Sequence, residues 1–284
     1  MKIRKLKEFL GINALRIAIL ISILFLFLFI GIVFSKGVKM ISFSFLLEPP
    51  RDGMTKGGIF PAIIGTLYLT VLAVLFAFPL GVLSAIYLVE YSKENFLVTI
   101  IRTAIGTLAG IPSIIFGLFG LAIFVITFGF GVSILSGSLT LGIMILPMVI
   151  KASEEALKAV PHSFREAAYA LGATKRQTIL KVIVPTALPS IMTGVIISIG
   201  RAAGETAPIL FTAATFYTRR LPRSVFDEVM ALPYHIYALM TEGTRPESQV
   251  PIAYGTSVIL LTLVLAISSL SIIIRYRIRR QRKW

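Results

Sequence analysis

Residues 103–150 read TAIGTLAGIPSIIFGLFGLAIFVITFGFGVSILSGSLTLGIMILPMVI, a run of 48 positions without one charged side chain. A membrane-spanning helix needs about 20 mostly apolar residues, so this run is too long for one span. Glycines and serines between Gly129 and Ser138 (GFGVSILSGS) divide it. The segment therefore predicts two helices in a membrane, roughly 102–128 and 139–158.

The composition of the whole chain agrees with a membrane protein. Of its 284 residues, 56% are hydrophobic and 14% are charged, whereas a soluble domain carries about 25% charged residues. The mean hydropathy is +0.90. Disordered, collagen-like and coiled-coil chains are excluded, and a soluble enzyme is not expected. The absence of cysteine excludes a disulfide scaffold, a thiolate zinc site and an iron–sulfur site.

Four more apolar stretches flank this run, so the sequence predicts six transmembrane helices in all. The predicted fold is all-α, that of a polytopic membrane protein. Basic residues before the first stretch resemble a signal peptide. That stretch is longer than a signal core, however, and FSKGVKM (34–40) offers no small-x-small cleavage site, so we expect it to be retained. The predicted helices are roughly 14–35, 61–89, 102–128, 139–158, 186–214 and 251–274.

The charges between these helices predict the orientation of the chain. Segments 1–16, 90–102, 151–181 and 275–284 together carry 19 basic and 6 acidic residues, whereas 36–58 and 216–249 carry 8 and 6. Lys and Arg stay preferentially in the cytoplasm, so we expect both termini there, in a multi-pass cell-membrane protein. This bias explains the net charge of +15 without nucleic acid. The basic tail 276–284 is expected to anchor the topology and to meet anionic lipid.

The segment between the fourth and fifth predicted helices is long and helix-patterned. Ser163 and Glu166 fit a capping box, and Gly172 stands where a helix ends in a left-handed residue. Thr174 is placed to cap a second helix that runs to Pro185. Local physics leaves two interpretations open, a surface helix on the membrane or a docking helix for a cytoplasmic partner. An apolar stripe at helical spacing comprises Phe164, Ala167, Ala168 and Leu171.

The same segment resembles a known family. Glu166-Ala167-Ala168, Gly172 and Val182-x-Val184-Pro185 are similar to the EAA loop of ABC importer permeases, EAA-x3-G-x9-I-x-L-P. The resemblance implies a MetI-like type I ABC importer permease fold, with residues 153–185 as a coupling loop for an ATPase subunit. The chain lacks G-x4-G-K-[ST], so ATP is expected to be used by that partner, with no cofactor bound by this chain. The residues implied in ATPase coupling are Phe164, Glu166, Ala167, Ala168, Leu171 and Gly172.

A second resemblance indicates the substrate. The stretch 201–213, RAAGETAPILFTA, is similar to the fifth helix of PstA-type phosphate permeases, R-x-x-G-E-T-A-P-L-L-F-T-A. The stretches 111–117, 146–157 and 230–243 resemble the same family, and the resemblance covers about residues 60–275. It implies import of inorganic phosphate together with a PstC-like second permease, two PstB-like ATPase subunits and an external PstS-like phosphate-binding protein. The chain then divides into residues 1–58, a five-helix permease core at 59–275 and the basic tail.

The expected substrate pathway centres on Arg201. A continuous helix from Pro185 to Thr218 would be roughly 51 Å long, more than a hydrocarbon core of about 30 Å, so we expect a break at Gly204 or Pro208. An Arg inside the membrane must face a partner or a cavity. Glu205 stands four residues on and can neutralise it. The residues expected along the pathway are Arg201, Glu205, Thr206, Lys151 and Ser113.

Several alternatives stay open. Arg201 and Glu205 could merely satisfy each other. Lys151, where the family usually has Arg, could be a snorkelling anchor, and Pro112-Ser113 could be a plain kink. Glu154 and Glu155 are expected to be solvated charges, and no metal site is expected at His162 or His235. The rival functions are a PstC-type permease, a permease for another oxyanion and an ion-coupled secondary carrier. A membrane enzyme is disfavoured because no catalytic set is present.

Overall fold

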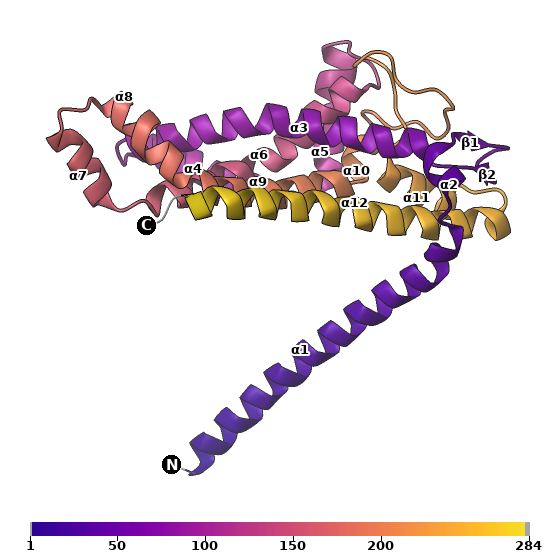
Figure 1. Ribbon diagram of the computed structural model, residues 1–284, viewed down its shortest axis with the longest axis horizontal. Coiled ribbons are helices and arrows are strands. Elements are labelled where there is room, and N and C mark those ends of the chain that lie inside the picture. Colours follow the sequence, from indigo (N-terminus) through magenta and orange to yellow (C-terminus); the bar gives the residue numbers. More distant parts are fainter. Residues whose placement is uncertain (1, 282–284) are drawn as a thin grey trace.

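The computed structural model describes residues 2–281 as a helical bundle with one two-stranded hairpin (Figure 1). Five helical segments are long and apolar enough to cross a membrane, or six if one bent pair counts as a span. The long helices are α1 (Lys2–Gly37), α3 (Phe60–Ile86), α6 (Ile134–Lys158), α9 (Val184–Gly204) and α12 (Pro246–Gln281).

Shorter elements join these helices. The α-helices among them are α2 (Phe43–Leu47), α4 (Phe96–Leu108), α5 (Ser113–Gly120), α7 (His162–Ala170), α8 (Lys175–Thr178), α10 (Ala207–Leu210) and α11 (Leu232–Thr241). The hairpin pairs β1 (Pro50–Arg51) with β2 (Lys56–Gly57) in antiparallel register. A 3-10 turn, η1 (Val38–Met40), and three π-helical turns, η2 (Tyr87–Tyr91), η3 (Leu121–Thr127) and η4 (Ile179–Ile183), complete the set.

The core of the bundle is built from α3, α6 and α9, and small residues let these helices approach closely. Gly81 of α3 faces Val149 of α6, and Gly194 of α9 faces Ala152 of α6, with no room for an added Cβ at either glycine. Close approach through small residues is the usual basis of helix packing in lipid, where the hydrophobic effect does not drive helices together. The helices that carry the predicted pathway residues are therefore held at short range.

Helix α1 diverges from the bundle over most of its length (Figure 1). Its C-terminal end contacts the rest of the chain: Val33 is buried, Gly37 lies against the backbone of Tyr254 in α12, and Lys36 Nζ stands 5.0 Å from the Tyr254 ring centroid. Apolar side chains such as Leu20 and Phe25 are exposed along it. Such a surface suits the hydrocarbon of a bilayer, as the hydropathy of the segment predicted.

The helix expected at 102–128 is the clearest error of the sequence interpretation. The structure has two helices there, α4 and α5 continued by η3, bent by 103° at the break. Pro112 has no N–H and disfavours helical geometry in the residue before it, and its own ψ is 137°. The Pro112-Ser113 dipeptide therefore makes a sharp elbow in a segment that the hydropathy predicted as one helix.

Other boundaries moved by a few residues. Helix α6 begins at Ile134 rather than 139, because the Ser133 side chain accepts a hydrogen bond from Ser136 N. The fifth helix is continuous from Lys175 and ends at Gly204, not at 214, which confirms the expected break. Helix α12 exceeds its predicted range of 251–274 at both ends. Residues 282–284 of the basic tail lie outside the described residues.

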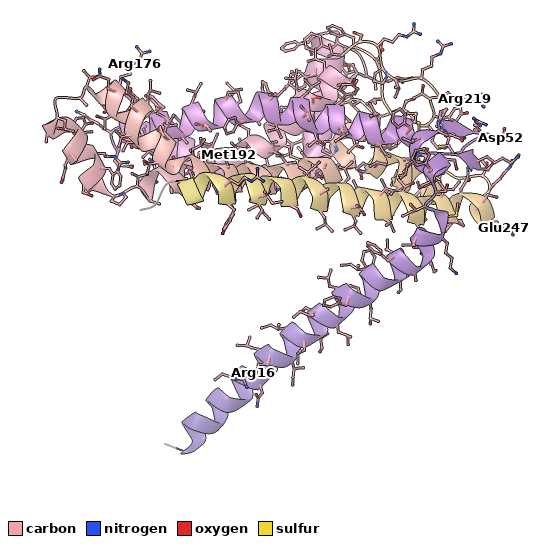
Figure 2. All side chains as sticks on the ribbon, in the orientation of Figure 1. Arg16, Asp52, Arg176, Met192, Arg219 and Glu247 are labelled. Atoms are coloured by element: carbon pink, nitrogen blue, oxygen red, sulfur yellow. The ribbon has the colours of Figure 1, made fainter. Side chains whose placement is uncertain are left out.

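The two ends of the bundle differ in what they carry. Helices α7 and α8 and the C-terminal end of the chain lie at one end, and α2, the hairpin and α11 lie at the other (Figure 1). In Figure 2, Arg176 marks the first end, and Asp52, Arg219 and Glu247 gather at the second. Side chain to backbone bonds tie the second end together, among them Gln249 Nε2 to Gly53 O at 3.0 Å. Helices α7 and α8 thus lie at the end of the bundle opposite to α2, the hairpin and α11.

Candidate functional site

Arg201 and Glu205 form an ion pair where α9 ends. Arg201 Nε lies 3.3 Å from Glu205 Oε1, and Arg201 Nη1 donates to the Met148 sulfur of α6 at 3.3 Å. The side chains are 33% and 18% exposed. The expected contact is present, but its geometry differs from a pair on one helical face. Helix α9 stops at Gly204, and Glu205 has an extended backbone, with φ −77° and ψ 132°.

The break after α9 places polar groups beside this pair. Gly204 is exposed, and a Cβ built on it would meet nothing within 4 Å, so one side of the break is open. Pro208, in the first turn of α10, has no N–H to continue the ladder from α9. On the closed side, a cavity of about 10 Å³ beside Glu205 is lined by Thr66 and Thr70. Thr206 lies at the same break, half-buried.

Lys151 is exposed on α6, and a Cβ added to Gly106 of α4 would lie 3.5 Å from its Nζ. Met148, which touches Arg201, precedes Lys151 by three residues and so lies about one turn away on the same side of α6. Lys151 therefore lies on the side of α6 that Arg201 contacts through Met148. No hydrogen bond or ion pair within the described residues joins Lys151 to the Arg201–Glu205 pair.

Ser113 begins α5 directly after the elbow and is half-buried. Gly117, one turn further along, packs against the backbone of Ala207 and Pro208 at the break. Ser113 is thus brought within about one helical turn of the break, although no hydrogen bond joins it to Arg201 in the part of the chain that the structure describes. The sequence analysis allowed a kink at Pro112-Ser113 within one helix; the 103° bend found there directs α5 to this position.

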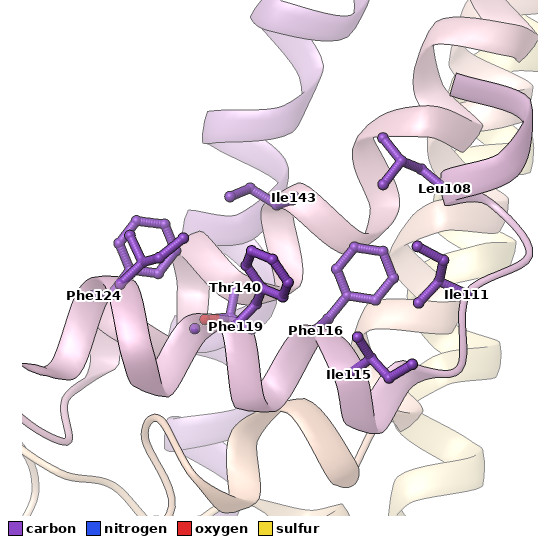
Figure 3. Close-up of a pocket in the computed structure, with 10 residues that line it drawn as sticks. Leu108, Ile111, Ile115, Phe116, Phe119, Phe124, Thr140 and Ile143 are labelled. Atoms are coloured by element: carbon purple, nitrogen blue, oxygen red, sulfur yellow. The ribbon is translucent and has the colours of Figure 1, made fainter. Parts of the chain in front are cut away.

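An apolar groove runs along α5 and η3 (Figure 3). Its volume is about 370 Å³, and Phe116, Phe119 and Ile143 are among the side chains that line it. The single hydroxyl in the lining, Thr140 Oγ1, already donates to Ser136 O at 2.7 Å. The groove therefore offers no free donor to an anion, and the polar break at Arg201 remains the candidate pathway.

The predicted coupling loop, residues 153–185, contains the two expected helices, but the predicted cap of the first helix is absent. Helix α7 begins at His162 after Pro161, with no side-chain cap, so the predicted capping box of Ser163 and Glu166 is not formed. Gly172 has φ +78°, which confirms its left-handed position. Thr174 does cap the second helix: its hydroxyl accepts from Gln177 N at 3.3 Å, and Gln177 Oε1 accepts from Thr174 N at 2.9 Å.

The predicted apolar stripe of α7 divides into two faces. Ala168 is buried, and Phe164 packs against the chain's own core cluster, which includes Leu157 and Ile183. Leu171 is 89% exposed. Phe164 and Ala168 therefore hold α7 to the bundle rather than face outward. Of the six residues predicted to couple to the ATPase, Glu166, Ala167, Leu171 and Gly172 are exposed.

Two charged contacts near this loop escaped the sequence analysis. Arg165 Nη2 lies 2.6 Å from Glu90 Oε1, and both side chains are largely buried. Glu154, which was expected to be solvated, is 14% exposed and lies 3.9 Å from Arg102 Nε, so that prediction was wrong. Glu155 is exposed as expected. No local pattern joins these partners, because Glu90 and Arg165 are 75 residues apart.

His235 is buried in α11, outside the membrane-spanning segments, and neither ring nitrogen has a hydrogen-bond partner among the described residues. Burial disfavours the imidazolium and lowers the pKa of His235 to about 4. Within residues that the structure describes, no three His, Cys, Asp or Glu side chains are grouped as metal ligands. His235 is therefore a neutral core histidine at neutral pH.

Comparison with known proteins identifies the family. Residues 77–283 match the family described as "Binding-protein-dependent transport system inner membrane component". The chain belongs to this family. It is a multi-pass inner-membrane permease subunit of an ABC importer and is not itself an enzyme. Its transport system includes an ATPase and a binding protein.

Relatives and a solved structure agree with this assignment. The chain is 39% identical over 227 residues to the phosphate transport system permease protein PstA of Mycobacterium leprae, covering 79% of this chain and 73% of the relative. It is 34% identical over 268 residues to a probable PstA of Methanocaldococcus jannaschii, covering 93% and 92%. The inward-facing MetNI methionine ABC transporter matches with a TM-score of 0.62 at 20% identity, over 76% of this chain and 94% of that chain. This match confirms the MetI-like fold.

Proposed function

We propose that this permease imports inorganic phosphate as a PstA-type subunit. In this proposal it pairs with a PstC-like permease, two PstB-like ATPase subunits and an external PstS-like phosphate-binding protein. The observation that carries the proposal is the guanidinium of Arg201 at the open break after α9. The relatives named as phosphate permeases support the choice of substrate.

The surroundings of Arg201 suit a transient anion site. One donor of the guanidinium is engaged by the carboxylate of Glu205, and another is engaged only by the Met148 sulfur, a weak acceptor. A phosphate oxygen would displace the sulfur and gain a charge-assisted hydrogen bond. Glu205 competes for the same guanidinium, so phosphate binds weakly and is released quickly. Weak binding of this kind favours transport through the site.

Three further side chains can contact phosphate along the proposed pathway, those of Lys151, Ser113 and Thr206. The hydroxyls of Ser113 and Thr206 lie at or near the break and can donate to a phosphate oxygen. Lys151 provides a second positive charge about one turn along α6 from Met148. An ammonium attracts phosphate as a point charge and lacks the planar fork of Arg. Arg201 therefore sets the orientation of the anion, and Lys151 draws it onward.

The orientation follows from the charges at the two ends of the bundle. We place both termini and the coupling loop 153–185 in the cytoplasm, and segments 36–58 and 216–249 outside. The permease core is residues 59–275, and the basic tail from 276 contacts anionic lipid. Helices α7 and α8 then face the ATPase. The docking surface comprises Glu166, Ala167, Leu171 and Gly172, and Phe164 and Ala168 support it from within the bundle.

Oxyanion competition in proteoliposomes tests the substrate. The complete complex is reconstituted with its binding protein, and ATP-driven uptake of labelled phosphate is measured against excess sulfate or molybdate. We expect excess unlabelled phosphate to lower the uptake of labelled phosphate, and excess sulfate or molybdate to leave it unchanged. Uptake of sulfate or molybdate in place of phosphate would reassign the permease to another oxyanion.

A further inference from the structure

The cytoplasmic end of α3 continues as the π-helical turn η2, and this turn contacts three separate elements. Its residues Leu88, Glu90 and Tyr91 each meet a cationic side chain from another part of the chain. A π-helical turn is wider than an α-helical one and occurs often at functional positions. Here it presents successive residues toward α4, α7 and α8.

The contact with α7 is the strongest of the three. Arg165 Nη2 donates to Glu90 Oε1 at 2.6 Å, and Arg165 Nε donates to the same oxygen at 3.3 Å. The remaining donors of Arg165 reach the carbonyls of Val160 at 2.9 Å and Leu157 at 3.2 Å, at the end of α6. The side chains of Arg165 and Glu90 are 13% and 8% exposed. A pair this dry is costly to break, because the surviving charge stays buried without its partner.

The other two contacts extend the same attachment. Lys175 Nζ of α8 lies 4.9 Å from the Tyr91 ring centroid, a cation–π distance. Arg102 Nη2 of α4 donates to Leu88 O at 2.9 Å. Both helices of the coupling loop are therefore bound to the end of α3 by side chains. Helix α7 is joined to α6 and to α8 by short non-helical segments at Pro161 and around Gly172, whereas α8 continues through η4 into α9.

We propose that Glu90 and Arg165 are positioning residues that transmit movement of the coupling loop into the transmembrane bundle. This inference rests on the proposed docking role of α7. When the ATPase displaces α7, the buried pair carries the displacement to η2 and so to α3. Helix α3 packs along α6 and α9, which carry Lys151 and Arg201. Without the pair, the joints at Pro161 and Gly172 absorb the displacement.

The coupling ratio tests this role in the complete reconstituted complex. We measure phosphate imported per ATP hydrolysed, together with the ATPase retained when the permease is purified by affinity. We expect Glu90→Gln and Arg165→Met each to lower the ratio roughly tenfold while the ATPase is retained. The charge swap Glu90→Arg with Arg165→Glu should restore a large part of it. Lys93→Gln, which removes an exposed charge near the same end but outside residues 153–185, is the matched control and should leave the ratio unchanged.

A bridged variant guards against simple misfolding. The chain has no cysteine, so Glu90→Cys with Arg165→Cys can be joined by a short thiol-specific cross-linker. We expect low coupling before cross-linking and recovery after it. An unchanged ratio in the single variants, or no recovery in either the swapped or the bridged variant, would overturn the proposal. A wild-type complex that imports no phosphate refutes the substrate instead, and the pair is then tested by the stimulation of ATP hydrolysis by the binding protein.

Discussion

Replacing Arg201 by Ala is the most informative perturbation of the pathway. The change removes the guanidinium that meets Glu205 Oε1 at 3.3 Å and leaves that carboxylate, 18% exposed, without its cation. Breaking a fully buried pair costs about 3–5 kcal/mol. Arg201 is a third exposed, so we expect a smaller loss of stability, of about 1–2 kcal/mol. The subunit should therefore still insert and assemble.

The loss of transport should be larger than the loss of stability. A hydrogen bond to a charged group contributes about 1.5–3 kcal/mol, so losing two to phosphate lowers uptake by about 100-fold or more. Arg201→Lys keeps the charge without the fork and should restore only part of the activity. Glu205→Gln removes the competitor, so both the turnover and the KM for phosphate should fall.

Initial rates of ATP-driven phosphate uptake in proteoliposomes measure these effects, with the amount of assembled complex as the control. The double change Arg201→Ala with Glu205→Ala separates the two interpretations of the pair. It leaves no unpaired charge, so a purely structural pair would allow normal transport. Normal phosphate uptake by that double variant would refute the assignment of Arg201 to the pathway.

Three further predictions concern other regions. A cysteine in place of Arg279 should escape an impermeant thiol reagent applied outside, and one in place of Asp52 should react; labelling of the first contradicts the topology. Gly172→Val places a Cβ at φ +78°, which costs roughly 1 kcal/mol. ATP hydrolysis coupled to transport should therefore fall in a complex that inserts normally, and unchanged coupling would speak against docking by α7. Because the pKa of His235 is lowered to about 4, the unfolded state binds the extra proton between pH 6.5 and 4. The free energy of unfolding should therefore drop by up to about 3 kcal/mol as the pH falls through that range. Thermal melts of the wild type and His235→Leu check this, and equal pH slopes count against a neutral buried His235.

Hydropathy and local chemistry predicted the parts of the fold that depend on neighbouring residues. The apolar runs located the spans, Gly172 marked the end of α7, and Thr174 marked the start of α8. The break at Gly204 followed from comparing the length of the apolar run with the thickness of a bilayer. These features are set within a few turns of the chain, so a single sequence suffices to find them.

Features set by tertiary contact escaped prediction. Hydropathy shows which segments prefer lipid but not the direction in which each helix runs. The two helices on either side of the 103° bend before Ser113 were therefore predicted as one helix. The sequence analysis did not find the Glu90–Arg165 pair, because nothing local shows that α7 folds back onto η2. The same holds for Glu154 and Arg102. In each case the partner lies on another helix, and only the packing of the bundle reveals it.

The energy source of phosphate uptake distinguishes an ATP-driven importer from an ion-coupled carrier. The complete complex, with its binding protein, is reconstituted in proteoliposomes without an ion gradient, and labelled phosphate is followed with ATP or with a non-hydrolysable analogue. We expect uptake with ATP, none with the analogue, and none when Arg201→Ala replaces the wild-type subunit. Phosphate uptake with the non-hydrolysable analogue, or in a parallel sample given an ion gradient and no ATP, would contradict ATP-driven import.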